Sequence, residues 1–161
     1  FSSSALAAGS ASFNVTVSIA AEAGISVSGG PIDFGVMRAG DTSASTKAAV
    51  VKNNGSGGNQ TYSLSLVNPD VWSAVTTTPG ADEYRLCCAF DTDGDVTWNP
   101  VNHSLTTIAQ TSTVTRFAGD EKGAAVPYNT DRHLYLRMET PTSTSSANTK
   151  TIQVVVVATV D

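Results

Sequence analysis

At 161 residues, the chain is long enough for one domain with a buried core and too short for two comfortable ones. Only 14% of its residues are charged and its net charge is −5, which argues against a nucleic-acid partner because such proteins need a basic patch. No apolar run approaches the ~20 residues of a membrane span. The most apolar stretch, residues 151–160, has the length of a strand.

The N-terminal stretch is rich in small residues. Residues 1–12 consist of Ser, Ala and Gly with one Phe and one Leu. They contain no Lys or Arg and no long apolar run, so they are not a whole signal peptide, but SALAAGSA resembles the small-residue end of one. We therefore expect an exported, extracellular protein.

Strict alternation of apolar and polar residues begins at Phe13. In FNVTVSI, the side chains of Phe13, Val15, Val17 and Ile19 share one face of a strand. We predict that this strand opens a single β-sandwich domain of residues 13–161, preceded by an extension of residues 1–12.

The rest of the chain repeats this pattern, with turn sequences such as SGGP and NNGSGGN between the apolar runs. Turn signals recur at roughly the 8–12-residue spacing of sandwiches and barrels. Further strands are predicted at residues 25–27, 32–34, 45–53, 61–67, 71–75, 83–90, 96–98, 112–117, 133–139 and 151–160. Helical spacing is confined to Val101, Leu105 and Ile108, whose polar neighbours suit a loop equally. The predicted fold is all-β: an antiparallel Ig-like or Greek-key (jelly-roll-like) sandwich of about ten strands with an extended N-terminal strand.

Residues 31–66 carry a recognisable order of motifs. A strand ends in Phe-Gly, an Ala-Gly-Asp turn follows, a Val-rich strand ends in Asn-Gly, and the next strand reads Tyr-x-Leu. This order resembles many secreted Ig-like domains. It is similar to fibre subunits of three kinds: TasA/camelysin-like fibre proteins, archaeal bundling pilins and spore-coat-U-type chaperone–usher pilins. The resemblance covers roughly residues 13–67, continues in residues 131–160, and implies a β-sandwich that serves as a subunit of an extracellular fibre.

The extension fits such a fibre as a strand donated to a neighbour. A sandwich with an open edge can accept a strand through main-chain hydrogen bonds, and head-to-tail repetition gives an open homopolymer. The odd positions of the extension continue the alternation that begins at Phe13. The candidate donor-strand residues are Phe1, Ser3, Ala5, Ala7, Gly9 and Ala11.

A second class of function stays open at this stage. A secreted Ig-like accessory, adhesion or carbohydrate-binding module would also suit the composition. Aromatic faces stack on sugar rings, and Trp72, Trp98, Tyr84 and Tyr128 could form such a platform, whereas the alternative for them is core packing.

The stretch CCAFDTDGD contains the most reactive groups. Asp91, Asp93 and Asp95 alternate as calcium ligands do, whereas the competing interpretation is a hairpin turn at Asp93-Gly94 between the predicted strands at residues 83–90 and 96–98. Calcium is the one cofactor that the sequence suggests.

The two cysteines, Cys87 and Cys88, are adjacent in the sequence. A vicinal bridge between them would be strained, because their Cα atoms lie ~3.8 Å apart. On a strand they point to opposite faces. They form either a vicinal or intermolecular disulfide, or one core side chain and one partly covered thiol.

Several other motifs bear on export and catalysis. Glycosylation sequons begin at Asn14, Asn54, Asn59 and Asn102, and chance alone also supplies sequons in a Ser/Thr-rich chain. The sequence contains no G-x-S-x-G, H-E-x-x-H or phosphate-binding glycine motif, so we expect no enzymatic activity. The histidine at position 103 is predicted to be a surface residue.

Overall fold

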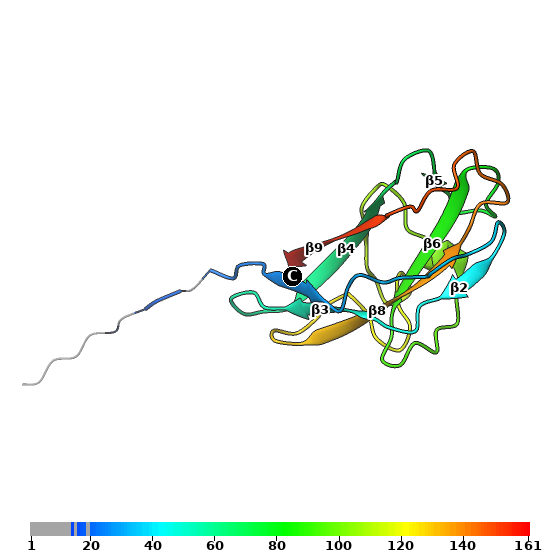
Figure 1. Ribbon diagram of the computed structural model, residues 1–161. Coiled ribbons are helices and arrows are strands. Elements are labelled where there is room, and N and C mark those ends of the chain that lie inside the picture. The colour runs from blue at the N-terminus through cyan, green and yellow to red at the C-terminus, as the bar shows by residue number, and fades with distance from the viewer. Residues whose placement is uncertain (1–13, 15, 19) are drawn as a thin grey trace, which may run out of the picture.

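The computed structural model describes residue 14, residues 16–18 and residues 20–161. Within this part of the chain, strands predominate and the only helix is a single turn, so the prediction of an all-β fold is confirmed (Figure 1). The elements are β1 (Ile25–Ser28), β2 (Thr42–Ala44), β3 (Ala49–Asn53), β4 (Gln60–Val67), β5 (Ser73–Ala74), β6 (Glu83–Phe90), α1 (Pro100–His103), β7 (Gln110–Thr111), β8 (Asp131–Glu139) and β9 (Gln153–Val160).

The strands form two sheets of unequal width. The wider sheet has six strands in the order β1-β3-β8-β6-β5, with β2 paired to the end of β8 beyond β3. The narrower sheet has three strands in the order β7-β4-β9. All pairs are antiparallel except the short β5–β6 pair.

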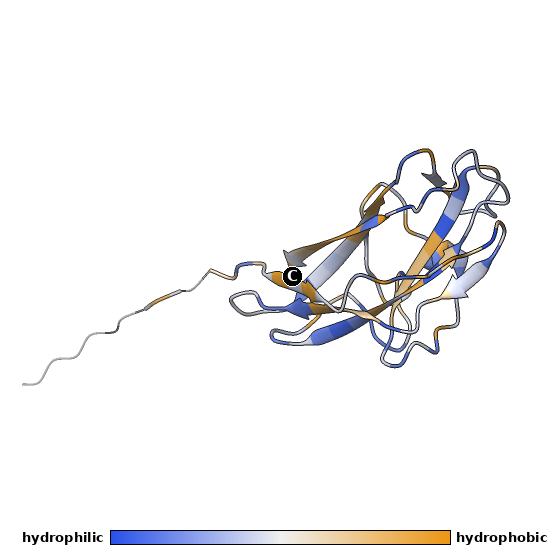
Figure 2. Ribbon diagram, in the orientation of Figure 1, coloured by the Kyte–Doolittle hydropathy of each residue, from blue (hydrophilic) through white to orange (hydrophobic). Residues whose placement is uncertain are grey.

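Alternation in the long strands builds a core that the two sheets share. In β4 every second side chain is buried, and Tyr62 of this strand packs against Phe90 of β6 with ring centroids 5.9 Å apart. Figure 2 shows apolar residues along β9 and along the second half of β6. The buried strand residues of this core are Val51, Tyr62, Leu64, Leu66, Tyr84, Leu86, Cys88, Phe90, Leu134, Leu136 and Met138. Removal of their apolar surface from water is the main force that joins the sheets.

The second half of β6 is buried on both faces, unlike the other strands. The chain after β6 folds back along the edge of this strand, where the Leu105 amide donates a backbone hydrogen bond to the Leu86 carbonyl and Ser104 pairs with Cys87. The turn of α1 begins there because the Asn99 side chain caps it by accepting the Val101 amide hydrogen.

Not every predicted strand forms. The described part of residues 13–19, namely Asn14, Thr16, Val17 and Ser18, is exposed and outside any strand, so the prediction that these residues pair within the body was wrong for them. The first strand instead begins at Ile25.

Three further stretches are irregular: residues 32–34, 96–98 and 112–117. In the last of these, the Thr113 hydroxyl accepts hydrogen bonds from the amides of Thr115 and Arg116, and this local turn replaces strand pairing. Conversely, β2 and β7 were not predicted from the sequence. The described residues form nine strands, so the prediction of about ten is not confirmed.

Two glycines with positive φ allow a matched test of the backbone. Gly94 has φ 85° and Gly40 has φ 77°, but an added Cβ at Gly94 would lie 2.6 Å from the Tyr135 ring, whereas nothing lies within 4 Å at Gly40. We expect Gly40→Ala to lower the free energy of unfolding by about 1–2 kcal/mol through backbone strain alone. Gly94→Ala should lower the free energy of unfolding, measured in urea, by more than Gly40→Ala does, because the added methyl group would also clash with the Tyr135 ring. Equal losses of unfolding free energy in the two variants would contradict this clash.

Candidate functional site: an open apolar groove

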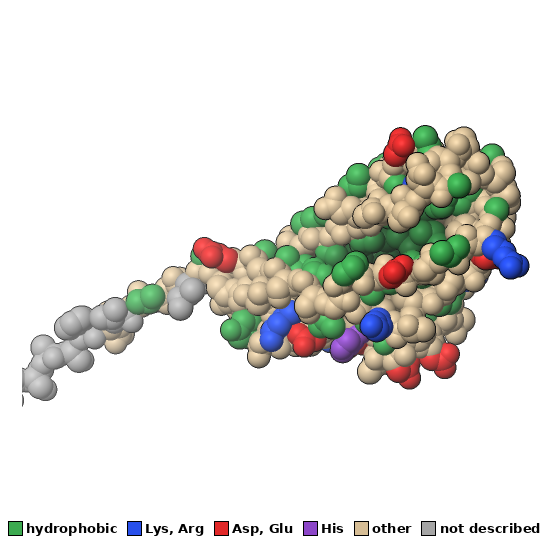
Figure 3. Space-filling view, in the orientation of Figure 1, with side chains coloured by type: hydrophobic (Ala, Val, Ile, Leu, Met, Phe, Trp, Pro, Cys, Tyr) green, Lys and Arg blue, Asp and Glu red, His purple; other side chains and the backbone are tan. Residues whose placement is uncertain are grey.

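An apolar groove opens between the two sheets on one side of the body (Figure 3). Its volume is about 840 Å³. Its floor is the inner face of the wide sheet, formed by Leu86 of β6 and by Leu134, Leu136 and Met138 of β8. The groove is thus a continuation of the core that the narrower sheet does not cover.

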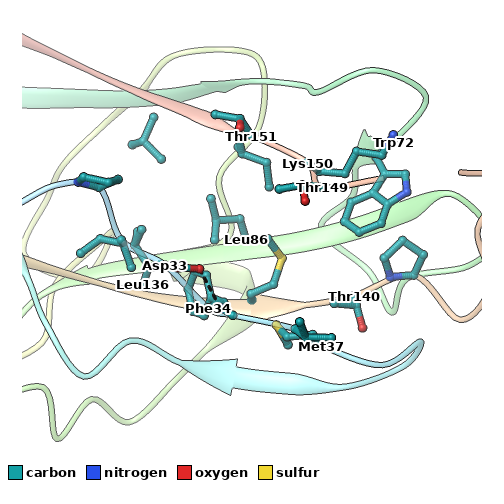
Figure 4. A pocket seen from close by; sticks show the side chains of 18 of the residues that line it. Asp33, Phe34, Met37, Trp72, Leu86, Leu136, Thr140, Thr149, Lys150 and Thr151 are labelled. Carbon is teal, nitrogen blue, oxygen red and sulfur yellow. Dashed lines mark hydrogen bonds between the residues drawn. The ribbon is translucent and has the colours of Figure 1, made fainter. Parts of the chain in front are cut away.

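Two stretches of chain form the walls. One wall is β9 with the residue before it, which contributes Ile152, Val154 and Val156. The other is the irregular segment of residues 30–39, which contributes Ile32, Phe34 and Met37. Figure 4 shows Phe34 and Met37 on one side, Thr149–Thr151 and Trp72 on the other, and Leu86 between them. These wall residues are only partly buried, although they pack against the core.

The edge of β9 that borders the groove has no strand beside it among the described residues. The even-numbered residues of β4 direct their backbone groups toward β7 and the loops beside it. For example, the Tyr62 amide donates to the Gly123 carbonyl, and the Leu66 amide donates to the Thr106 carbonyl. The odd-numbered residues therefore bond to β9. From the register of β4 and β9, the backbone N–H and C=O groups of Val154, Val156, Ala158 and Val160 face the open edge.

The opposite wall is also free of sheet pairing. This part of the chain is fully described, and none of residues 31–37 makes a backbone–backbone hydrogen bond to either sheet. The segment is held at its end instead, where the Gly40 amide donates to the Pro141 carbonyl at 2.8 Å and the Thr140 hydroxyl donates to the Arg38 carbonyl at 2.7 Å. Both walls of the groove thus combine apolar side chains with backbone groups that are not paired in a sheet.

A hydrogen-bonded chain fixes the end of the groove. The Trp72 indole N–H donates to the Thr144 hydroxyl at 2.9 Å, and this hydroxyl donates to the Asp82 carboxylate at 2.9 Å. The Ser145 amide donates to the same carboxylate, and this backbone hydrogen bond is the main reason that the pKa of Asp82 is lowered. Trp72 also packs against Tyr84, with ring centroids 6.1 Å apart.

The candidate donor-strand residues at positions 1–11 lie outside the described residues. The groove itself was not predicted from the sequence. A usable signal was present, however, because residues 32–34 alternate as a strand and β9 is apolar on both faces.

The aspartates predicted as calcium ligands are not gathered around a common point. Asp91 is buried, and its carboxylate accepts the amide hydrogens of Gly94 at 2.8 Å and Asp120 at 3.1 Å. Asp93 instead accepts the Asp95 amide hydrogen at 3.0 Å. No group of three metal-ligating side chains occurs within the described part of the chain. These hydrogen bonds fit a local turn better than a calcium site, but residues 96–98 form no strand, so the turn does not close the predicted hairpin.

Both cysteines are free and completely buried. Cys88 lies in the core, and Cys87 on the opposite face is covered by the loop that carries Ser104, whose hydroxyl is 3.6 Å from its sulfur. Burial raises the pKa of both thiols. The partly covered thiol expected from the sequence is therefore fully covered, and neither sulfur is accessible to another chain.

The four sequons differ in exposure. Asn14 is exposed, and Asn54 and Asn59 are exposed in the loop between β3 and β4. Asn102 is half-buried in α1, and the Ser104 of its sequon is buried. The first three positions are the ones a glycan could occupy without unfolding the body.

His103 is buried, which corrects the prediction of a surface residue. Its Nδ1 accepts the Asn99 amide hydrogen at 3.1 Å, so its Nε2 carries the proton and donates to the Ala118 carbonyl at 3.2 Å. Burial lowers the pKa of His103, and the hydrogen bond that Nδ1 accepts from Asn99 requires the neutral ring.

Comparison of the chain with protein-family models, with curated proteins and with solved structures gives no match. Among the described helices, none has the length and apolar character needed to cross a membrane. The groove is therefore the feature from which function can be argued.

Thiol titration tests the state of the cysteines. We expect no reaction of the native chain with Ellman's reagent, because both sulfurs are buried. In guanidinium without reductant, two thiols per chain should react, since both cysteines are free. Fewer than two would indicate a disulfide.

The burial of His103 predicts a pH dependence. The unfolded chain, with an ordinary histidine pKa of about 6.5, takes up the proton before the folded chain does, so stability falls as the pH drops through that value. In urea unfolding, the free-energy difference between the parent chain and His103→Gln should therefore narrow from pH 8 to pH 5. A control is His133→Gln, which removes a more exposed imidazole and leaves His103 in place. If the difference in unfolding free energy between the parent chain and His103→Gln stays constant from pH 8 to pH 5, the assignment of a buried neutral imidazole to His103 is contradicted.

Proposed function

We propose that the protein is a structural subunit of an extracellular filament or pilus. In this proposal the body is an Ig-like sandwich that lacks one strand, and the N-terminal part of a neighbouring subunit supplies it by donor-strand complementation. The observation that carries the proposal is the apolar groove beside the open edge of β9.

The chemistry of the groove suits an extended peptide better than a small polar ligand. Its long walls offer unpaired backbone groups on β9, and its floor is aliphatic, with Leu86, Leu136 and Met138. A strand inserted there would pair its backbone with β9 and bury alternate side chains against the floor. An exposed groove of this kind is otherwise a liability for aggregation.

A filament follows if each subunit both gives and receives one strand. Because the donating segment and the accepting groove are different surfaces, the contact is heterologous and can repeat without closing. The small number of charged residues, 14% of the chain, limits repulsion between packed subunits. The role is structural and self-associating, which accords with the resemblance to fibre subunits.

The carbohydrate-binding alternative has less support. Tyr84 is fully buried, so its ring cannot stack on a sugar. Trp72 lies at the end of the groove with its N–H already bonded to Thr144, and Trp98 packs its ring against His103. The aromatic residues considered for a sugar platform are thus divided among different environments.

Neighbouring residues of β9 provide a matched test of the groove. Val156 lines the groove, whereas Val157 is 51% exposed and does not line it. We expect negative-stain microscopy to show filaments for the full chain and for Val157→Asp, but none for Val156→Asp, because a buried carboxylate would oppose strand insertion. Circular dichroism would establish that each variant is folded.

If Val156→Asp fails to fold, Met37→Asp on the opposite wall replaces it, since Met37 lies in a segment without sheet pairing. Monodisperse small particles of the full chain at all concentrations would overturn the filament proposal. If Met37→Asp forms filaments as abundantly as the full chain does, the groove is not the surface that accepts the strand.

A further inference from the structure

The chain just before β1 is fixed to the loop between β3 and β4. The Ser56 amide donates to the Glu22 carbonyl at 3.0 Å, and the Glu22 amide donates to the Ser56 hydroxyl at 2.6 Å. The Asn54 amide donates to the Gly24 carbonyl at 3.1 Å, and the Ser56 hydroxyl donates to the Ala20 carbonyl at 3.3 Å. Residues 20–24 therefore continue the line of β1 beyond the end of the sheet.

The described residues before this attachment, Asn14 and residues 16–18, are exposed and do not line the body's own groove. Ile25 pairs with Asn53, the last residue of β3, so the chain before Ile25 lies past the end of its partner strand. Figure 1 shows residues 20–24 at the end of the body where the C-terminus lies. Val17, which precedes them, is 79% exposed. To enter its own groove, the chain would have to reverse direction where these hydrogen bonds hold it.

We propose that residues 13–19 of a second copy of this chain are the strand that occupies the groove, with the side chains of Phe13, Val15, Val17 and Ile19 directed to its floor. This inference rests on the proposed filament function. It moves the donated strand from residues 1–11 to the segment that sequence analysis assigned to the body itself.

The period of the segment matches that of the groove. Its four large apolar residues occur at every second position, as do Ile152, Val154 and Val156 along the wall. In neighbouring strands such positions repeat every ~6.8 Å. Successive donated side chains can therefore lie beside the three wall side chains in one register.

The size and charge of the segment fit as well. Protein interiors are close-packed, and a groove of about 840 Å³ needs large side chains to fill it. Residues 13–19 provide one Phe, one Ile and two Val for it, whereas the odd positions of residues 1–11 provide one Phe and otherwise only Ser, Ala and Gly. Glu22 is the first residue of the chain with a charged side chain, so the inserted strand would bury none.

Adjacent substitutions in the full chain test the assignment. Val17→Asp places a carboxylate on the inserted face, Thr16→Asp places it on the opposite face, and Ala7→Asp places it on the earlier candidate strand. We expect Val17→Asp to abolish filaments by negative-stain microscopy and to sediment as a monomer. Thr16→Asp and Ala7→Asp should assemble like the parent chain. The melting temperature of the Val17→Asp monomer should show that the body remains folded.

A mixing experiment identifies the two surfaces directly. Val17→Asp keeps an intact groove, and Met37→Asp keeps an intact segment of residues 13–19. Neither variant should assemble alone, but an equimolar mixture should give a one-to-one complex of about twice the 16.6 kDa monomer mass in analytical ultracentrifugation. Such a complex cannot grow, because its remaining segment and its remaining groove are the substituted ones.

The outcomes separate this inference from the function on which it rests. If Ala7→Asp abolishes filaments and Val17→Asp does not, the donated strand lies in residues 1–11 and the present assignment is overturned while the filament stands. Equal assembly of Val17→Asp and Thr16→Asp also overturns it. Absence of filaments from the parent chain overturns both proposals.

Discussion

The core between the two sheets has to be covered on both faces, and the narrower sheet does not extend far enough to do this. Six strands form one layer and three form the other, so part of the inner face of β6 and β8 has no strand opposite it. The same deficit leaves one edge of β9 with backbone groups that no described residue pairs. Apolar surface and unpaired backbone coincide in one place, and a strand is the structure that satisfies both.

The walls of the groove are set by interactions that do not involve an occupant. The hydrogen bonds of Thr140 hold the end of one wall, and the chain from Trp72 through Thr144 to Asp82 holds the end of the groove. Binding costs less when the receiving surface is ordered in advance. On the donating side, residues 20–24 are hydrogen-bonded to the β3–β4 loop, and the described residues before them are exposed.

The long strands were predictable because each alternates over enough residues to give a clear period. The strands predicted at residues 61–67, 83–90, 133–139 and 151–160 correspond to β4, β6, β8 and β9, with bounds that differ by at most two residues. The two-residue and three-residue strands β5, β7 and β2 carry too few residues for a period, and β2 and β7 were missed. Where Thr113 or Asp91 satisfies nearby amides with its own side chain, local hydrogen bonds determine the chain path instead of strand pairing.

The amino-acid sequence by itself determined the all-β class, the core faces of the long strands and the uncharged character of the N-terminal residues, since these follow from residue type and period. Only the tertiary structure decided which apolar stretches find a partner. Residues 13–19 alternate as well as β4 does, yet their described residues lie outside the body, and the shorter apolar stretch of residues 32–34 lines a groove. Strand pairing depends on a free edge at the right place in the sheet, and alternation within one segment carries no information about that edge.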